Sequence, residues 1–331
     1  MPLLAVIFFL LIFTGIYSYL DYQGKIYLWM DNYYAKRRPV LPPFKKTASY
    51  QIGFITDAHG YRTIKYGNKL SPKVEEPLKA AVAHMNNVFK PDLVVQNGDF
   101  IEGTGKSFEG GTKDYLEMKK FYDQLEMPHY HVVGNHDLRP FDKEQWKKLN
   151  GLDSTYYYVE IGDLRIFVLD SNFVPGNSLE EEREVGPGVD YTRGYVSQEE
   201  IDWLKKVLAE SYKFRKIVMI HHPPQESTFY KSNPSHFLRN GSQLREIFSQ
   251  YKVQAVFSGH IEELYHEKID GVDYYVLPGF WKSNEEKMSR LGDAEHAYKG
   301  AYAEITAGKK VTVKLFYYKK DQEQYFSRAI K

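Results

Sequence analysis

Hydrophobic and polar residues alternate along this chain in two patterns, one typical of buried strands and one typical of amphipathic helices. Short apolar runs predict strands over residues 50–55, 92–95, 129–133, 156–160, 164–169, 217–220, 255–257, 274–277, 301–305 and 311–318. Helical spacing predicts helices over 77–89, 115–125 and 197–208, and two loops are expected over 103–114 and 172–194. Strands that alternate with helices and are then followed by hairpins indicate an α/β fold whose sheets have antiparallel parts.

A different pattern occupies the first twenty residues, where no charged residue occurs. At about 1.5 Å per residue, a helix of this length would extend roughly 30 Å, the thickness of the hydrocarbon core of a bilayer. A signal peptide and a buried core helix are the alternatives, but a signal peptide usually has a basic start and small residues at its cleavage site. No Lys or Arg precedes this run, and Tyr17, Tyr19 and Leu20 lie near its end. We therefore expect a single-pass anchor in the cell membrane, with the lipid bilayer as the partner of residues 1–20.

The segment that follows bears on orientation and on the domain boundaries. Its basic residues, Lys25 and Lys36 to Arg38, slightly favour a cytoplasmic catalytic domain by the positive-inside rule. Prolines between Pro39 and Pro43 predict a stiff connection to the main domain. We expect a transmembrane anchor at 1–20, a juxtamembrane linker at 21–48, a catalytic domain at 49–319 and a C-terminal tail at 320–331.

Composition narrows the chemistry. The 331 residues include 44 basic and 43 acidic ones, so the chain lacks the basic excess of most nucleic-acid-binding proteins. The expected loop over 172–194 is acidic at residues 180–182 and at Glu184, which also argues against a nucleic-acid partner. We expect no nucleic-acid partner. The chain has no cysteine, which excludes disulfides, thiolate metal sites and a cysteine nucleophile. A metal site would have to be built from His, Asp, Glu and Asn.

Residues of these types follow five predicted strands at the point where each strand ends. They are Asp57 and His59, then Asp99, then Asn135 to Asp137, then His221 and His222, and finally His260 and Glu262. In open α/β sheets, ligands bind at the carboxyl ends of the strands. Each short motif alone could be a turn or a surface histidine, but five in succession predict one metal centre.

The motifs Asp57-x-His59, Gly98-Asp99, Gly134-Asn135-His136-Asp137, His221-x-Pro223 and Gly259-His260 resemble those of the calcineurin-like metallophosphoesterase superfamily, the metallo-dependent phosphatases. The resemblance extends over about residues 50–318 and includes Leu169-Asp170-Ser171. It implies two facing mixed β-sheets flanked by helices, and a hydrolase that uses a dinuclear metal centre. The implied substrate is a phosphorylated compound, either a phosphomonoester or a phosphodiester.

The resemblance also implies a role for each motif residue. The first metal would be bound by Asp57 and His59, and Asp99 would bridge both metals. The second metal would be bound by Asn135, His221 and His260. Two further residues would be catalytic: His136 would donate a proton or hydrogen bond to the phosphate, and Asp137 would orient it.

One position departs from the family pattern. The family usually has Gly-His-x-His at the last motif, and Glu262 stands here in place of the second histidine. A carboxylate can bind a hard divalent ion, so we expect Glu262 to be a metal ligand and Mn to be the favoured ion, with Fe, Zn and Mg as alternatives. The other interpretation is a weakened first metal site. In that case the chain would be a membrane-tethered binding module with little catalysis.

Overall fold

The computed structural model describes residues 49–61, 65–66, 69–70, 74–176, 182–189, 193–225, 236–262, 264–280, 299–319 and 324–330. The expected membrane span at 1–20 and the linker at 21–48 lie outside these residues. Among the helices of the described part, none is both long and apolar enough to cross a bilayer.

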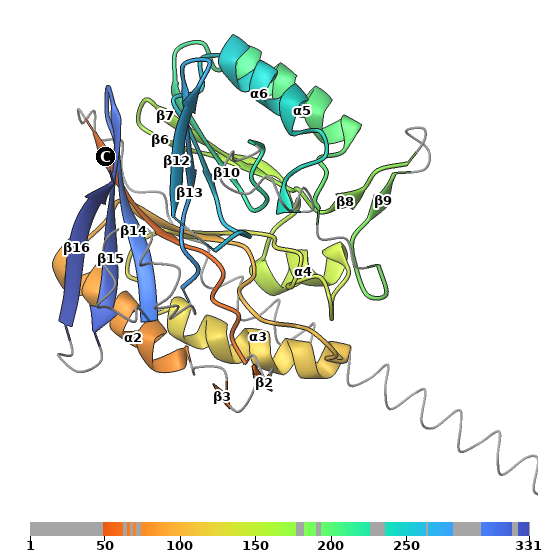
Figure 1. The fold of residues 1–331 in the computed structure, drawn as a ribbon, viewed down its shortest axis with the longest axis vertical. Helices are drawn as coiled ribbons and strands as arrows, with labels where there is room; N and C mark the ends of the chain where they lie inside the picture. The colour runs from red at the N-terminus through yellow and green to blue at the C-terminus, as the bar shows by residue number, and fades with distance from the viewer. Residues whose placement is uncertain are drawn as a thin grey trace, which may run out of the picture.

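Two six-stranded mixed sheets face each other, as the resemblance implies (Figure 1). The first sheet has the order β16 (Gln324–Ile330), β15 (Val311–Lys319), β14 (Lys299–Ala307), β1 (Tyr50–Ile55), β4 (Leu93–Asn97) and β5 (His129–Val132). The second has the order β12 (Tyr265–Ile269), β13 (Val272–Val276), β11 (Ala255–Ser258), β10 (Arg215–Ile220), β7 (Leu164–Leu169) and β6 (Tyr157–Ile161). Short pairs also form between β2 (Lys65–Tyr66) and β3 (Lys69–Leu70), and between β8 (Phe173–Val174) and β9 (Arg183–Glu184).

Both sheets contain parallel and antiparallel strands. In the first sheet the antiparallel strands β14, β15 and β16 lie together on one side, whereas in the second sheet one antiparallel strand lies at each edge, β12 and β6. In the first sheet β1, β4 and β5 run in parallel, and in the second sheet β7, β10, β11 and β13 do so. Nearly every residue of β4, β7 and β10 is buried, which explains their continuous apolar runs. The carboxyl ends of the parallel strands therefore lie along one edge of each sheet.

Helices cover the outer faces of both sheets (Figure 1). The first sheet is covered by α2 (Glu75–His84), its π-helical continuation η1 (Met85–Phe89) and α3 (Phe108–Tyr122), and the second by α5 (Gln198–Glu210) and α6 (Gly241–Gln250). A further short helix, α4 (Lys143–Asn150), packs against the same hydrophobic cluster as α2 and α3. Apolar side chains from the inner faces of both sheets form a third cluster between them.

Three expectations change, the first being that the expected loop over 172–194 contains β8 and β9. The stretch 103–114 is not a loop throughout, because α3 begins at Phe108 with the Ser107 side chain accepting a hydrogen bond from Gly110 N. Gly111 lies within this helix. A Cβ at this position would lie 2.4 Å from a side-chain atom of Pro140, so packing requires a glycine here. The segment 320–331, expected as a tail, contains β16, which pairs with β15 along seven residues.

Candidate metal centre

The polar residues that follow the parallel strands converge where the edges of the two sheets meet. Contacts between the sheets show this directly. The Asn97 side-chain amide, at the end of β4, donates to the carbonyl of Ile220, at the end of β10, over 3.1 Å. The backbone N–H of His260, after β11, donates to the carboxylate of Asp57, after β1, over 3.0 Å. Residues that are 203 positions apart in the sequence are therefore neighbours here.

Five of the predicted ligands have left-handed backbone conformations. The φ angles are 51° at Asp57, 45° at His59, 53° at Asp99, 61° at His260 and 57° at Glu262. Such conformations cost about 1–3 kcal/mol each in residues other than glycine, and they cluster at functional sites. The sharp bends let the loops turn back at once after their strands, and so bring side chains from separate loops together.

Glycines allow these loops to approach one another closely. A Cβ at Gly134 would lie 2.1 Å from the backbone nitrogen of Asp99. A Cβ at Gly98 would lie 2.4 Å from Nδ1 of His221, and one at Gly259 would lie 2.2 Å from Oδ2 of Asp57. The glycine in each motif is therefore required by packing as well as by the turn.

One group of potential ligands contains Asp57, His59 and Glu262, each of which offers a ligand atom within 4.8 Å of the others. Nε2 of His59 lies 3.1 Å from Oε1 of Glu262 and 3.8 Å from Oδ1 of Asp57. The Glu262 side chain thus lies where the resemblance places a histidine in other members of the superfamily.

A second group forms around Asp99 and His221. Nε2 of His221 lies 3.3 Å from Oδ2 of Asp99 and 3.3 Å from Oδ1 of Asn135. The same Oδ2 of Asp99 lies 3.6 Å from Nε2 of His59, so this carboxylate lies between the two groups. The ring of His260 is 5.3 Å from that of His221, and its Nε2 is buried without a hydrogen-bond partner among the described residues.

The electrostatics of the centre favour positive charge. Burial alone would lower the pKa of His221, but the Asp99 carboxylate outweighs it and raises the pKa to about 9. Burial raises the pKa of Asp57 to about 6, helped by the charges of Asp99 and Glu262. Burial would likewise raise the pKa of Asp99, yet the charges of His221 and His136 hold it well below its usual value.

These observations fit a pair of divalent cations. Buried carboxylates that draw protons onto neighbouring imidazoles would be satisfied equally by metal ions. His221 donates from Nδ1 to the carbonyl of Asn97 over 2.9 Å, which leaves Nε2 as the ligand atom and is the usual support of a metal-binding histidine. The donor set of imidazoles, carboxylates and an amide suits Mn, Fe, Zn or Mg.

The predicted catalytic pair is arranged differently from our expectation. We expected Asp137 to orient His136. Instead, the Asp137 carboxylate accepts hydrogen bonds from the backbone N–H groups of Phe100, Ile101 and Gly134, at 2.8, 3.2 and 3.0 Å. Asp137 therefore joins the loop of Asp99 to the loop of Asn135, because its short side chain reaches the adjacent backbone rather than the imidazole of His136.

Sequence reasoning missed Glu102, which holds His136 in place of Asp137. Nδ1 of His136 lies 2.9 Å from the Glu102 carbonyl oxygen and 3.2 Å from its Oε1. Oε2 of the same carboxylate lies 3.0 Å from Nδ1 of His59, and Thr104 also donates to it. The only signal in the sequence was an acidic residue three positions after Asp99. All seven predicted ligands lie in the centre, and Glu102 connects two of its histidines.

A sandwich of two mixed sheets with metal-ligand residues at the strand ends defines a class of metal-dependent hydrolases. The chain belongs to the calcineurin-like phosphoesterase family, whose model matches residues 50–262, and it is a hydrolase of phosphoester bonds.

Its similarity to individual proteins is more distant. It is 26% identical to the probable glycerophosphodiester phosphodiesterase GpdQ of Arcobacter nitrofigilis, over 63% of this chain and 71% of that protein. It is 24% identical to the 3',5'-cyclic adenosine monophosphate phosphodiesterase CpdA of Haemophilus influenzae, over 58% of this chain and 62% of that protein. A dimetal phosphatase from Danio rerio shares the fold, with a TM-score of 0.59, 15% identity, and 85% and 99% of the two chains covered.

Proposed function

We propose that this protein hydrolyses a phosphodiester with two divalent metal ions, held by Asp57, His59, Asp99, Asn135, His221, His260 and Glu262. The observation that carries the proposal is the position of Asp99, whose Oδ2 lies within 3.6 Å of Nε2 of His59 and 3.3 Å of Nε2 of His221. A carboxylate between two sets of ligands is suited to bridging two cations. A diester is favoured over a monoester because GpdQ and CpdA are both named as phosphodiesterases.

When bound, two divalent cations would neutralise the phosphoryl oxygens and lower the pKa of a water molecule that attacks phosphorus. The protein positions the ester and supplies the proton for its departing oxygen. Because Glu102 accepts from Nδ1 of His136, Nε2 is the ring nitrogen that can hydrogen-bond the departing oxygen of the ester. The side chain of His136 is 16% exposed, so solvent can return a proton after each turnover.

Hydrolysis by the full-length chain in detergent tests the proposal. With Mn²⁺ we expect turnover of bis-p-nitrophenyl phosphate at a higher kcat/KM than p-nitrophenyl phosphate. His136→Ala should lower turnover by about 100-fold or more while bound manganese stays constant. The matched control is His266→Ala, because His266 pairs with Asp273 between β12 and β13 and belongs to none of the groups of potential ligands among the described residues.

The second candidate, a binding module with little catalysis, predicts a different result. Bound metal without hydrolysis of either ester would favour it and would contradict the catalytic proposal. The short distance between Nε2 of His59 and Oε1 of Glu262 supports a complete first metal site, and this weighs against the binding module.

We also propose that residues 1–20 anchor the protein in the cell membrane with the catalytic domain on the cytoplasmic side. The support is the uncharged run of residues and the basic residues that follow it. Membranes washed with carbonate at high pH should retain the full chain, and protease added outside intact cells should leave it uncut. Release into the carbonate supernatant would contradict the anchor, and external cleavage would contradict the orientation.

A further inference from the structure

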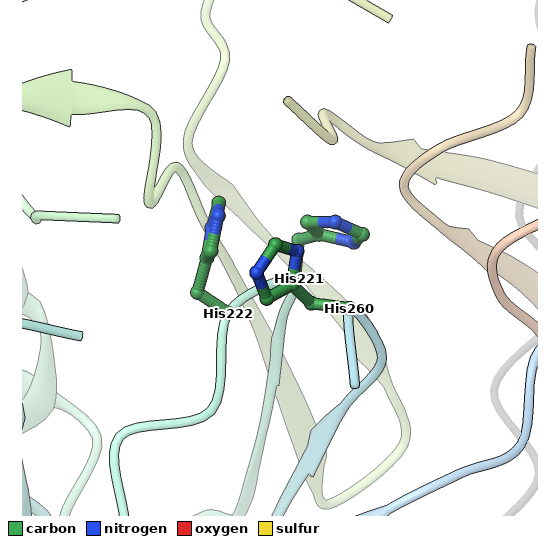
Figure 2. A group of neighbouring side chains, drawn as sticks. All are labelled: His221, His222 and His260. Carbon is green, nitrogen blue, oxygen red and sulfur yellow. The ribbon is translucent and has the colours of Figure 1, made fainter. Parts of the chain in front are cut away.

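His222 is a third imidazole beside the proposed ligands His221 and His260. Its neighbour His221 binds in the centre, so an extended chain would point His222 to the opposite face. Its ring instead lies 4.2 Å from that of His260 and 5.0 Å from that of His221, measured between centroids. Figure 2 shows the three rings gathered at one point. One ring nitrogen of each histidine lies within 4.8 Å of the other two.

The position of His222 is set by a serine from another strand. Nδ1 of His222 lies 2.7 Å from Oγ of Ser171, and the same oxygen accepts from the backbone N–H of His222 over 3.2 Å. Ser171 follows β7 in the Leu169-Asp170-Ser171 stretch, for which the proposed mechanism has no use. A hydrogen bond at one ring nitrogen is the usual way to orient a metal-binding histidine and leaves the other nitrogen as the ligand.

Packing keeps the ring in place from the other side. His222 is completely buried, and a Cβ at Gly194 would lie 2.6 Å from its Cγ. Gly194, with a φ of 73°, therefore leaves just enough room for the imidazole. A hydrogen-bonded and enclosed ring has little freedom to lose when its other nitrogen binds an ion.

We propose that His221, His222 and His260 form a three-histidine site for a borderline transition ion such as Zn²⁺, and that Zn²⁺ bound there withdraws His221 and His260 from the dinuclear centre. Three imidazoles suit the four-coordinate geometry of Zn²⁺, with Zn–N distances of about 2.0–2.1 Å. Mn²⁺ and Mg²⁺ prefer oxygen ligands and gain little from His222. The competition, but not the binding of Zn²⁺, rests on the proposed function.

The site makes Zn²⁺ an inhibitor of the Mn²⁺-loaded enzyme. Zn²⁺ that binds through His222 takes His221 and His260, two of the proposed ligands of the second metal. Inhibition by Zn²⁺ should therefore depend on His222, which the proposed hydrolytic reaction does not need.

Metal binding to the full-length chain in detergent, stripped of metal by a chelator, tests this site. Zn²⁺ and Mn²⁺ are titrated by calorimetry, and Co²⁺ replaces Zn²⁺ as a spectroscopic probe, because four-coordinate Co²⁺ absorbs visible light more strongly than six-coordinate Co²⁺. His222→Phe keeps a ring against His260 but removes the ligand nitrogen. We expect Zn²⁺ affinity to fall by more than about tenfold, the strong Co²⁺ absorption to decrease, and Mn²⁺ affinity to be unchanged.

Two further variants keep the test decisive. Ser171→Ala retains His222 and removes the hydrogen bond that aims it, so Zn²⁺ affinity should fall by about tenfold, and this variant decides the question if His222→Phe does not fold. His266→Phe is the matched control, since it replaces an imidazole stacked on Tyr275 at 4.2 Å by another ring, and it should leave every metal affinity unchanged.

Three results would separate the interpretations. Equal Zn²⁺ affinity and Co²⁺ spectra in His222→Phe and the parent chain would overturn the site. Parallel loss of Zn²⁺ and Mn²⁺ binding would also overturn it, because His222 would then only maintain the fold. Binding of Zn²⁺ through His222 in a chain that hydrolyses no phosphoester would support the site while refuting the proposed function.

Discussion

Glu102→Gln tests whether one carboxylate controls both a metal ligand and the proposed proton donor. In the structure Oε2 accepts from Nδ1 of His59 over 3.0 Å, and Oε1 lies 3.2 Å from Nδ1 of His136. Glutamine has almost the same shape but replaces one accepting oxygen with an NH₂ group. Whichever way the amide turns, one of the two histidines faces a donor in place of a carboxylate oxygen, although His136 keeps the Glu102 carbonyl oxygen 2.9 Å from its Nδ1.

The size of the effect follows from these contacts. A hydrogen bond to a charged group contributes about 1.5–3 kcal/mol, and loss of a partner that orients a metal ligand usually costs about 10–100-fold in affinity or activity. We therefore expect kcat/KM to fall by about 10–100-fold, equivalent to about 1.4–2.7 kcal/mol. If the amide oxygen remains on His59, the loss appears in turnover. If it remains on His136, the loss appears in manganese affinity.

The assay is hydrolysis of bis-p-nitrophenyl phosphate over a range of Mn²⁺ concentrations, with bound manganese measured on the same samples. Glu117→Gln is the control, because Glu117 is exposed on α3 and accepts a hydrogen bond from the hydroxyl of Tyr61. Parental kcat/KM and manganese affinity in Glu102→Gln would refute the role assigned to this carboxylate.

Four further predictions concern the centre and the core. Asp99→Asn removes the charge between the two ligand groups, so elemental analysis should show bound manganese reduced by about half or more, with turnover lowered by about 100-fold; full metal content would argue against bridging. Gly134→Ala places a Cβ 2.1 Å from the backbone nitrogen of Asp99, so we expect about 2 kcal/mol less stability in urea unfolding, together with weaker metal binding. Phe248→Ala truncates a side chain on the buried face of α6 and should cost about 3–5 kcal/mol without changing the metal content of the folded protein. Glu262→His supplies the usual family residue and should shift the ratio of Zn²⁺ to Mn²⁺ affinity towards zinc by about tenfold; an unchanged ratio would show that Glu262 is not a ligand.

Apolar patterns predicted the elements that are buried on both faces, and failed where local composition conflicts with tertiary packing. The strands β1, β7 and β10 were predicted at or within two residues of their bounds because most of their side chains are apolar and buried. The start of α3 was assigned to a loop because Gly110 and Gly111 disfavour helices. The close approach of Pro140 explains why a glycine is required at position 111. The sequence alone does not show that contact.

The limits of the site prediction have a similar cause. The convergence of the proposed ligands was predictable because each follows a strand, and parallel strands end at a common edge. The residues that orient the ligands act between loops, as Ser171 does on His222 across 51 positions, and no periodic pattern marks such a pair. Asp137 shows the converse, since the resemblance implied a contact with His136, whereas the Asp137 carboxylate accepts hydrogen bonds from backbone N–H groups instead. Strand ends therefore determine which residues can approach a metal, whereas contacts between loops determine which ring nitrogen each histidine presents to it. The contact of Ser171 with Nδ1 of His222 is what orients His222 towards the centre.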